Sequence, residues 1–175
     1  MKTLTLLSLS ALALVLSACT VTFGLEVDRR PPGGLTTSNE TYRSNYEAYV
    51  DGVRTPIICA DRTTLVTYGF NFSGDLRSWS SYLKGRRTGA TVERATFTAN
   101  SRTVDYGSNR VDVEYTIPAG LAPQSTQDAP IQPQGIEVVP KAVVTGYTEL
   151  FVDINGFGEG FGFRFRGIPV VSNCG

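Results

Sequence analysis

Two acidic side chains with the spacing of a catalytic pair occur at Asp112 and Glu114. They alternate with apolar residues, so in an extended strand both carboxylates leave the same face, roughly 6–7 Å apart. Carboxyl groups at that separation can hydrolyse a glycosidic bond, with one as the acid and the other as the base or nucleophile. A solvated strand with an alternating charged face has the same spacing without any chemistry, and we favour that interpretation.

The other ingredients of catalysis or metal binding are scarce. Histidine is absent, which removes the commonest general base at neutral pH and the commonest metal ligand. Asp153 and Asn155 match two positions of a calcium loop, but Arg164 occupies the place of its bidentate acid and repels a cation. Asp105 with Asn109 is a second calcium candidate, in a polar loop. We expect no enzyme activity, no cofactor and no metal ion.

Residues 1–18 form a leader in which Lys2 supplies a positive charge. Its apolar run from Leu4 to Leu16 is too short for a membrane-spanning helix, which needs roughly 20 apolar residues. The leader ends in Leu16-Ser17-Ala18-Cys19, which resembles the lipobox of bacterial lipoprotein precursors. The resemblance implies that a signal peptide of residues 1–18 is cleaved off. It also implies a diacylglyceryl group on the sulfur of Cys19 and a fatty acyl group such as palmitate on its amino group. An ordinary secretory signal also fits this leader, and Cys19 is then incidental.

Lipidation at Cys19 implies a location as well as an anchor. Each buried CH₂ contributes about 0.8 kcal/mol, so two or three acyl chains make release from a membrane negligible. Thr20 follows the cysteine, whereas the retention signal of enteric inner-membrane lipoproteins is Asp at that position. The resemblance therefore implies the cell envelope, with the outer membrane favoured over the inner membrane.

Cys59 and Cys174 remain once Cys19 carries lipid. In an exported protein an even pair of cysteines predicts a disulfide. The bridge would close a loop of about 115 residues, which in the chain-entropy model contributes roughly 4–5 kcal/mol. The alternative is two free thiols or a catalytic cysteine, for which the chain offers no histidine partner.

The composition suits one folded domain after the leader. The 175 residues contain 16 basic and 16 acidic side chains, and this balance gives no argument for a nucleic-acid partner. We divide the chain into the signal peptide (1–18), an acylated segment with a first strand and a Pro/Gly-rich link (19–40), and a single β domain (41–175).

Apolar and polar residues alternate with a period of two along most of the chain, which predicts strands rather than helices. The first alternation, at 21–27, begins two residues after Cys19 and leads into the link at 29–40. Residues 118–135 contain four prolines and are predicted to form a long loop within the domain. Further strands are expected at 46–50, 55–59, 66–72, 76–83, 90–99, 111–117, 149–154 and 161–166.

The last two of these strands are predicted to form a hairpin with Gly158-Glu159 at its tip, because glycine suits the first central position of a type II′ turn. A slip of one residue would set apolar residues against charged ones. This turn predicts the cross-strand pairs Val152–Phe165, Ile154–Phe163 and Asp153–Arg164.

Nine or ten short strands joined by turns predict an all-β fold, either an antiparallel β-sandwich or a barrel. An immunoglobulin-like sandwich is the nearest general architecture, but its spacing of cysteines and tryptophan is missing. Aromatic residues in such strands are more often core than surface, although they can form a platform for glycans or proteins. The aromatic candidates are Tyr42, Tyr46, Tyr49, Trp79 and Tyr82.

These observations lead to a first hypothesis of a non-catalytic envelope lipoprotein that binds, scaffolds or completes a cell-surface or outer-membrane assembly. Its partners are then membrane lipid through Cys19 and another envelope protein or a surface glycan, with strand edges and the Phe-rich hairpin as contact surfaces. An envelope hydrolase that cleaves glycan with Asp112 and Glu114 is the first alternative. A carrier of small apolar ligands, with the sheet closed around a cavity, is the second.

Overall fold

The computed structural model of the chain describes residues 23–27, 34–85, 89, 91, 95–120, 135–139, 143–156 and 161–174. Within these ranges the chain forms twelve β-strands and no helix, so the all-β prediction is confirmed. The predicted signal peptide, Cys19 and most of the predicted loop at 118–135 lie outside the described residues. Among the described residues there is no helix with the length and apolar character that crossing a membrane requires.

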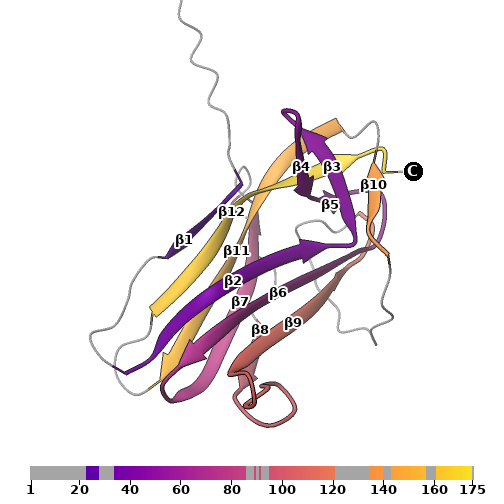
Figure 1. The fold of residues 1–175 in the computed structure, drawn as a ribbon. Helices are drawn as coiled ribbons and strands as arrows, with labels where there is room; N and C mark the ends of the chain where they lie inside the picture. The colour runs from indigo at the N-terminus through magenta and orange to yellow at the C-terminus, as the bar shows by residue number, and fades with distance from the viewer. Residues whose placement is uncertain are drawn as a thin grey trace, which may run out of the picture.

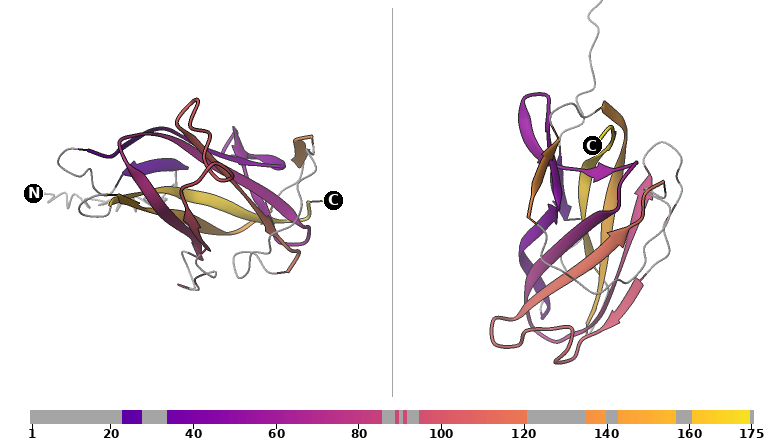
Figure 2. Two further views of the ribbon diagram at one scale, coloured as in Figure 1. Left: turned by 90° about the horizontal axis from the view of Figure 1, so that it is seen from below. Right: turned by 90° about the vertical axis from the view of Figure 1, so that its right-hand side faces the viewer.

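Two sheets pack face to face and make the sandwich (Figures 1 and 2). The larger, sheet A, has the order β1 (Gly24–Val27), β12 (Phe161–Ser172), β11 (Val143–Gly156), β7 (Leu76–Gly85) and β8 (Ala95–Thr98), and the short β5 (Ile58–Cys59) runs parallel to the end of β12. Sheet B has the order β2 (Thr36–Ser44), β6 (Thr64–Ser73) and β9 (Arg110–Ile117).

A third, small sheet covers one end of the sandwich. Sheet C consists of β10 (Glu137–Val139), β3 (Tyr46–Val50) and β4 (Val53–Pro56), with β10 parallel to β3. Asp51 and Gly52 join β3 to β4 with positive φ angles of 51° and 80°, as the Asp-Gly signal predicts for a tight hairpin turn. The sequence did not predict β10, because a parallel pairing leaves no local turn signal.

Aromatic side chains fill the space between sheets A and B. Trp79, Tyr68, Phe70 and Phe163 are almost completely buried, and the ring of Phe70 makes edge contacts with Trp79 at 6.1 Å and with Phe163 at 5.5 Å. Of the aromatic candidates from the sequence, Tyr42, Tyr46 and Trp79 are core residues, Tyr82 is half-buried and Tyr49 is 65% exposed.

The predicted hairpin of β11 and β12 forms, but with a register shifted by two residues. Phe165 lies opposite Leu150, Phe163 opposite Val152, and Asp153 faces Gly162 instead of Arg164. A shift of two keeps every side chain on its predicted face, so alternation alone cannot distinguish the two registers. The hairpin phenylalanines at 161, 163 and 165 are buried, which corrects the expectation that they form a contact surface.

The first strand belongs to the main sheet. β1 pairs antiparallel with β12, and Phe23 just before it stacks with Phe165 and contacts Tyr42, which lies in β2 of the other sheet. Glu26 accepts a hydrogen bond of 2.8 Å from Arg164, and this bond holds the pKa of Glu26 below its usual range. β2 begins at Thr36, inside the stretch 29–40 that the sequence predicts as a link.

The buried hydroxyl group of Tyr42 leads to a prediction about stability. It has no hydrogen-bond partner among the described residues, so Tyr42→Phe is expected to raise the free energy of unfolding by about 1 kcal/mol.

Burial also raises the pKa of Tyr42 well above 10, and that of Tyr68 to about 12. Because both folded-state pKa values exceed those of the unfolded chain, stability is full below pH 10 and falls above it.

Urea unfolding at pH 8 and pH 11 tests this prediction. Tyr42→Phe should gain stability at pH 8 and lose less of it at pH 11 than the natural chain. Tyr68→Phe is the matched control, because the Tyr68 hydroxyl donates to Ser81 Oγ at 2.9 Å and accepts from Trp79 Nε1 at 3.1 Å. This control should lose about 1 kcal/mol, and a loss of similar size in Tyr42→Phe would refute the assignment.

Candidate functional site

The predicted cysteine pair is joined at the end of the sandwich that sheet C covers. Cys59 in β5 and Cys174 form a disulfide with a Cα–Cα distance of 6.1 Å. Both are buried in a second apolar core between sheet C and the end of β12. Asp61 lies beside them and accepts a hydrogen bond of 3.2 Å from the Cys174 backbone N–H. Although the three residues could group around a metal ion, both sulfur atoms are used by the disulfide, so we assign no metal there.

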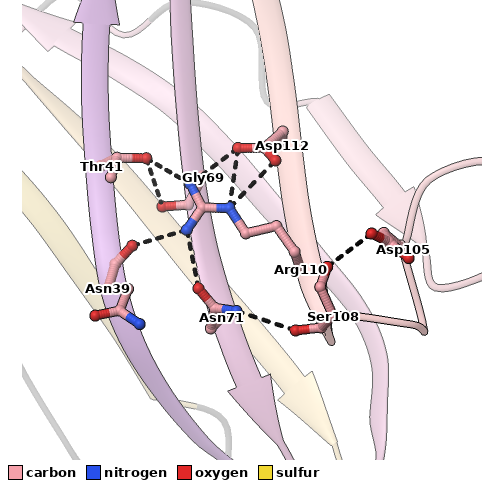
Figure 3. Close-up of polar contacts among 8 residues, drawn as sticks. All are labelled: Asn39, Thr41, Gly69, Asn71, Asp105, Ser108, Arg110 and Asp112. Carbon is pink, nitrogen blue, oxygen red and sulfur yellow. Dashed lines mark hydrogen bonds and ion pairs between the residues drawn. The ribbon is translucent and has the colours of Figure 1, made fainter.

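The outer face of sheet B carries the most organised polar cluster, centred on Arg110 at the start of β9 (Figure 3). Its Nη2 donates to Thr41 Oγ1 at 2.7 Å, and its Nη1 donates to the Asn39 carbonyl at 2.9 Å and to Asn71 Oδ1 at 3.1 Å. Its Nε donates to both carboxylate oxygens of Asp112, at 3.1 and 3.2 Å. The guanidinium group therefore binds all three strands of the sheet together, and we call this arrangement the Arg110 clasp.

Gly69 in the middle of β6 makes the clasp possible. A Cβ atom at this position would lie 2.1 Å from Asp112 Oδ1, 2.4 Å from Arg110 Nη2 and 2.8 Å from the Val111 carbonyl oxygen. Glycine in a strand interior often marks a close approach of another group. Here the group is the guanidinium, which crosses the strand where a side chain would otherwise stand (Figure 3).

The predicted catalytic pair lies on this outer face, but its two members have different surroundings. Asp112 is engaged by Arg110, which suits a structural role. Glu114 is half-buried, its Oε1 has no hydrogen-bond partner among the described residues, and burial raises its pKa. A carboxyl group with a raised pKa is what a general acid requires, and the hydrolase therefore stays an untested alternative.

The loop between β8 and β9 is held by its own hydrogen bonds. Asp105 Oδ1 accepts from the Gly107 N–H at 2.9 Å and its Oδ2 accepts from Ser108 Oγ at 2.7 Å. These bonds hold the pKa of Asp105 below its usual range. The buried side chain of Val104 anchors the loop in the core. Both carboxylate oxygens of Asp105 therefore have a structural role in the loop, and we assign no calcium ion to Asp105 and Asn109.

An open groove of about 560 Å³ runs between this loop and the start of β9. Its lining is mostly polar and combines both charges, with Arg102 and Arg110 against Asp105 and Asp112. Tyr106 is 53% exposed at the groove, and its ring makes an edge contact of 6.5 Å with Phe72. An exposed aromatic ring on an ordered loop beside hydrogen-bonding groups suits recognition of a polar partner.

The outer face of sheet A carries a row of side chains that includes Tyr82, one of the aromatic candidates from the sequence. Tyr82 stacks on Phe151 at 4.9 Å, and the guanidinium of Arg164 lies over the Phe151 ring at 5.5 Å.

Ser81 and Lys84 in strand β7 have the S-x-x-K spacing of some serine hydrolases. However, Ser81 is buried in the core and Lys84 is exposed, so the two do not form a catalytic pair.

Comparisons of this chain with models of protein families, with curated proteins and with solved structures found no match. The candidate sites therefore rest on the chemistry and geometry of the chain itself. Cys19, the residue predicted to carry lipid, lies outside the described residues.

Proposed function

We propose that the chain is a lipoprotein of the bacterial cell envelope, anchored through acylated Cys19, whose β-sandwich is a non-catalytic binding or scaffold module. The outer membrane is the favoured location, because Thr20 follows the cysteine. The partner is another envelope protein or a surface glycan.

The observation that carries this proposal is the place of β1. It begins five residues after Cys19 and is hydrogen-bonded along β12, with Phe23 packed between the two sheets. Anchoring of Cys19 would therefore hold the folded domain directly at the membrane instead of on a long tether.

The groove lies on the opposite side of the sandwich from β1, which supports a recognition role. Figure 1 shows β1 and β2 along one side and β8 and β9 along the other, in agreement with the strand orders of sheets A and B. The loop with Tyr106 connects β8 to β9. On a domain anchored through Cys19, close to β1, this loop can face away from the membrane, where a partner has access to it.

Substitution of the cysteine tests the proposal. We expect the natural chain to sediment with the membranes of its own cell, and Cys19→Ala to be released in soluble form or to accumulate unprocessed. Ser10→Ala, in the leader but outside the motif at 16–19, is a control that leaves the cysteine and the cleavage site in place. Unchanged membrane attachment of Cys19→Ala would contradict the proposal.

Glycan hydrolysis is a second candidate, favoured by the raised pKa of Glu114. It predicts that the purified protein cleaves peptidoglycan and that Glu114→Gln abolishes the cleavage. The proposal of a binding module predicts no cleavage by either chain. The third possibility, a carrier of small apolar ligands, has less support, because Trp79, Phe70 and Phe163 occupy the space between the sheets.

A further inference from the structure

The β1 side of the sandwich has apolar side chains that are exposed among the described residues. Leu25 and Val27 lie opposite Phe165 and Phe163 of β12, so they share the face of sheet A that packs against sheet B. Phe165 and Phe163 are buried, whereas Leu25 and Val27 are each 45% exposed. Among the described residues the seam between the two sheets is therefore open at β1, although the alternation at 21–27 predicts a half-buried strand with both residues on its apolar face.

The distance to Cys19 limits what can cover this seam. Four residues of fully extended chain span at most about 14 Å, so the Cα of Cys19 lies within that distance of the Cα of Phe23. If Cys19 is acylated, its acyl chains are in a bilayer and the β1 side of the domain lies beside the headgroups.

The chemistry of this side fits the boundary between headgroups and acyl chains. β1 ends sheet A, so its outer backbone groups have no partner strand among the described residues, and headgroups and water can satisfy them. Arg166, 44% exposed and ion-paired with Glu26, and Arg43 of β2, also exposed, carry guanidinium groups that long side chains can extend to phosphate oxygens.

We propose that the β1 side, with Leu25 and Val27 at its centre, docks on the lipid surface and fixes the orientation of the domain. This inference rests on the proposed anchoring at Cys19. It goes further, because an anchored domain can also rotate freely around its attachment point. Docking turns the groove at Tyr106 away from the membrane.

Tryptophan fluorescence distinguishes docking from free rotation. The probes are Val27→Trp and, in case that variant folds poorly, Leu25→Trp, each purified with its acyl chains. Each protein is reconstituted into vesicles of phosphatidylethanolamine and phosphatidylglycerol whose acyl chains carry bromine as a quencher. The natural Trp79 is fully buried and gives a constant background. Tyr106→Trp is the matched control, because this residue is similarly exposed on the opposite side of the sandwich.

Docking predicts that Val27→Trp or Leu25→Trp loses about half of its added fluorescence to the brominated lipid, since interfacial groups lie within reach of the acyl chains. Tyr106→Trp should lose almost none. Sedimentation of the vesicles is measured on the same samples. If all the variants sediment and the three probes are quenched equally, anchoring stands and docking is wrong. If none sediments, both the anchoring and the docking are wrong.

Discussion

A Cys59→Ser, Cys174→Ser double variant is expected to lose about 2–4 kcal/mol of unfolding free energy. The bridge connects residues separated by 115 positions in the sequence, so its removal gives the unfolded chain much more conformational freedom. It also joins the C-terminal end of β12 to β5, next to the second core. The loss should therefore include local loosening of sheet C.

Urea unfolding with and without dithiothreitol measures this effect. The natural chain should show the same loss in the reductant, and the double variant should be insensitive to it. Hydrogen exchange should become faster first in β3, β4 and β5, before sheets A and B are affected. An equal midpoint for the oxidised and reduced natural chain would contradict the prediction.

Gly69→Ala is expected to cost about 1–3 kcal/mol, the range of overpacking in a tightly packed site. Replacing glycine by alanine inside a strand is ordinarily favourable, because glycine loses more conformational entropy on folding. At Gly69 the new methyl group would collide with Arg110 Nη2, Asp112 Oδ1 and the Val111 carbonyl. The sign of the effect is therefore reversed by the Arg110 clasp.

Two comparisons test this cause. Gly146→Ala in β11 is the matched control, since a Cβ there meets no atom within 4 Å, and it should be neutral or slightly stabilising. In an Arg110→Ala background the cost of Gly69→Ala should be smaller, because the guanidinium that the methyl group would meet is gone. The difference between the two costs is the interaction energy of the double-mutant cycle. Equal costs in both backgrounds would show that the clasp is not the reason for the glycine.

The alternation of apolar and polar residues was sufficient to predict the class of fold and most strands. It could not determine the hairpin register, because registers two residues apart bury the same faces of Val152 and Ile154. It also missed the parallel contacts of β10 with β3 and of β5 with β12. Such contacts join distant parts of the chain and have no signal in the local sequence.

The candidate sites were predictable to different degrees. Cys59 and Cys174 could be paired, because they are the two cysteines that remain once Cys19 is predicted to carry lipid. The Arg110 clasp could not be predicted, since it depends on β2, β6 and β9 lying side by side. Gly69 inside the predicted strand 66–72 was a signal of a close approach that the sequence offered. The exposure of Leu25 and Val27 was missed because alternation defines a face but not what covers it.

Anchoring through Cys19 is tested most directly by the mass of the N-terminal peptide of the mature protein, purified from the membranes of its own cell. Such anchoring predicts a chain that starts at Cys19 and carries a diacylglyceryl group on the sulfur, with or without a further acyl chain on the amino group. A mature chain that starts elsewhere, or an unmodified Cys19 in the membrane-bound protein, would contradict it.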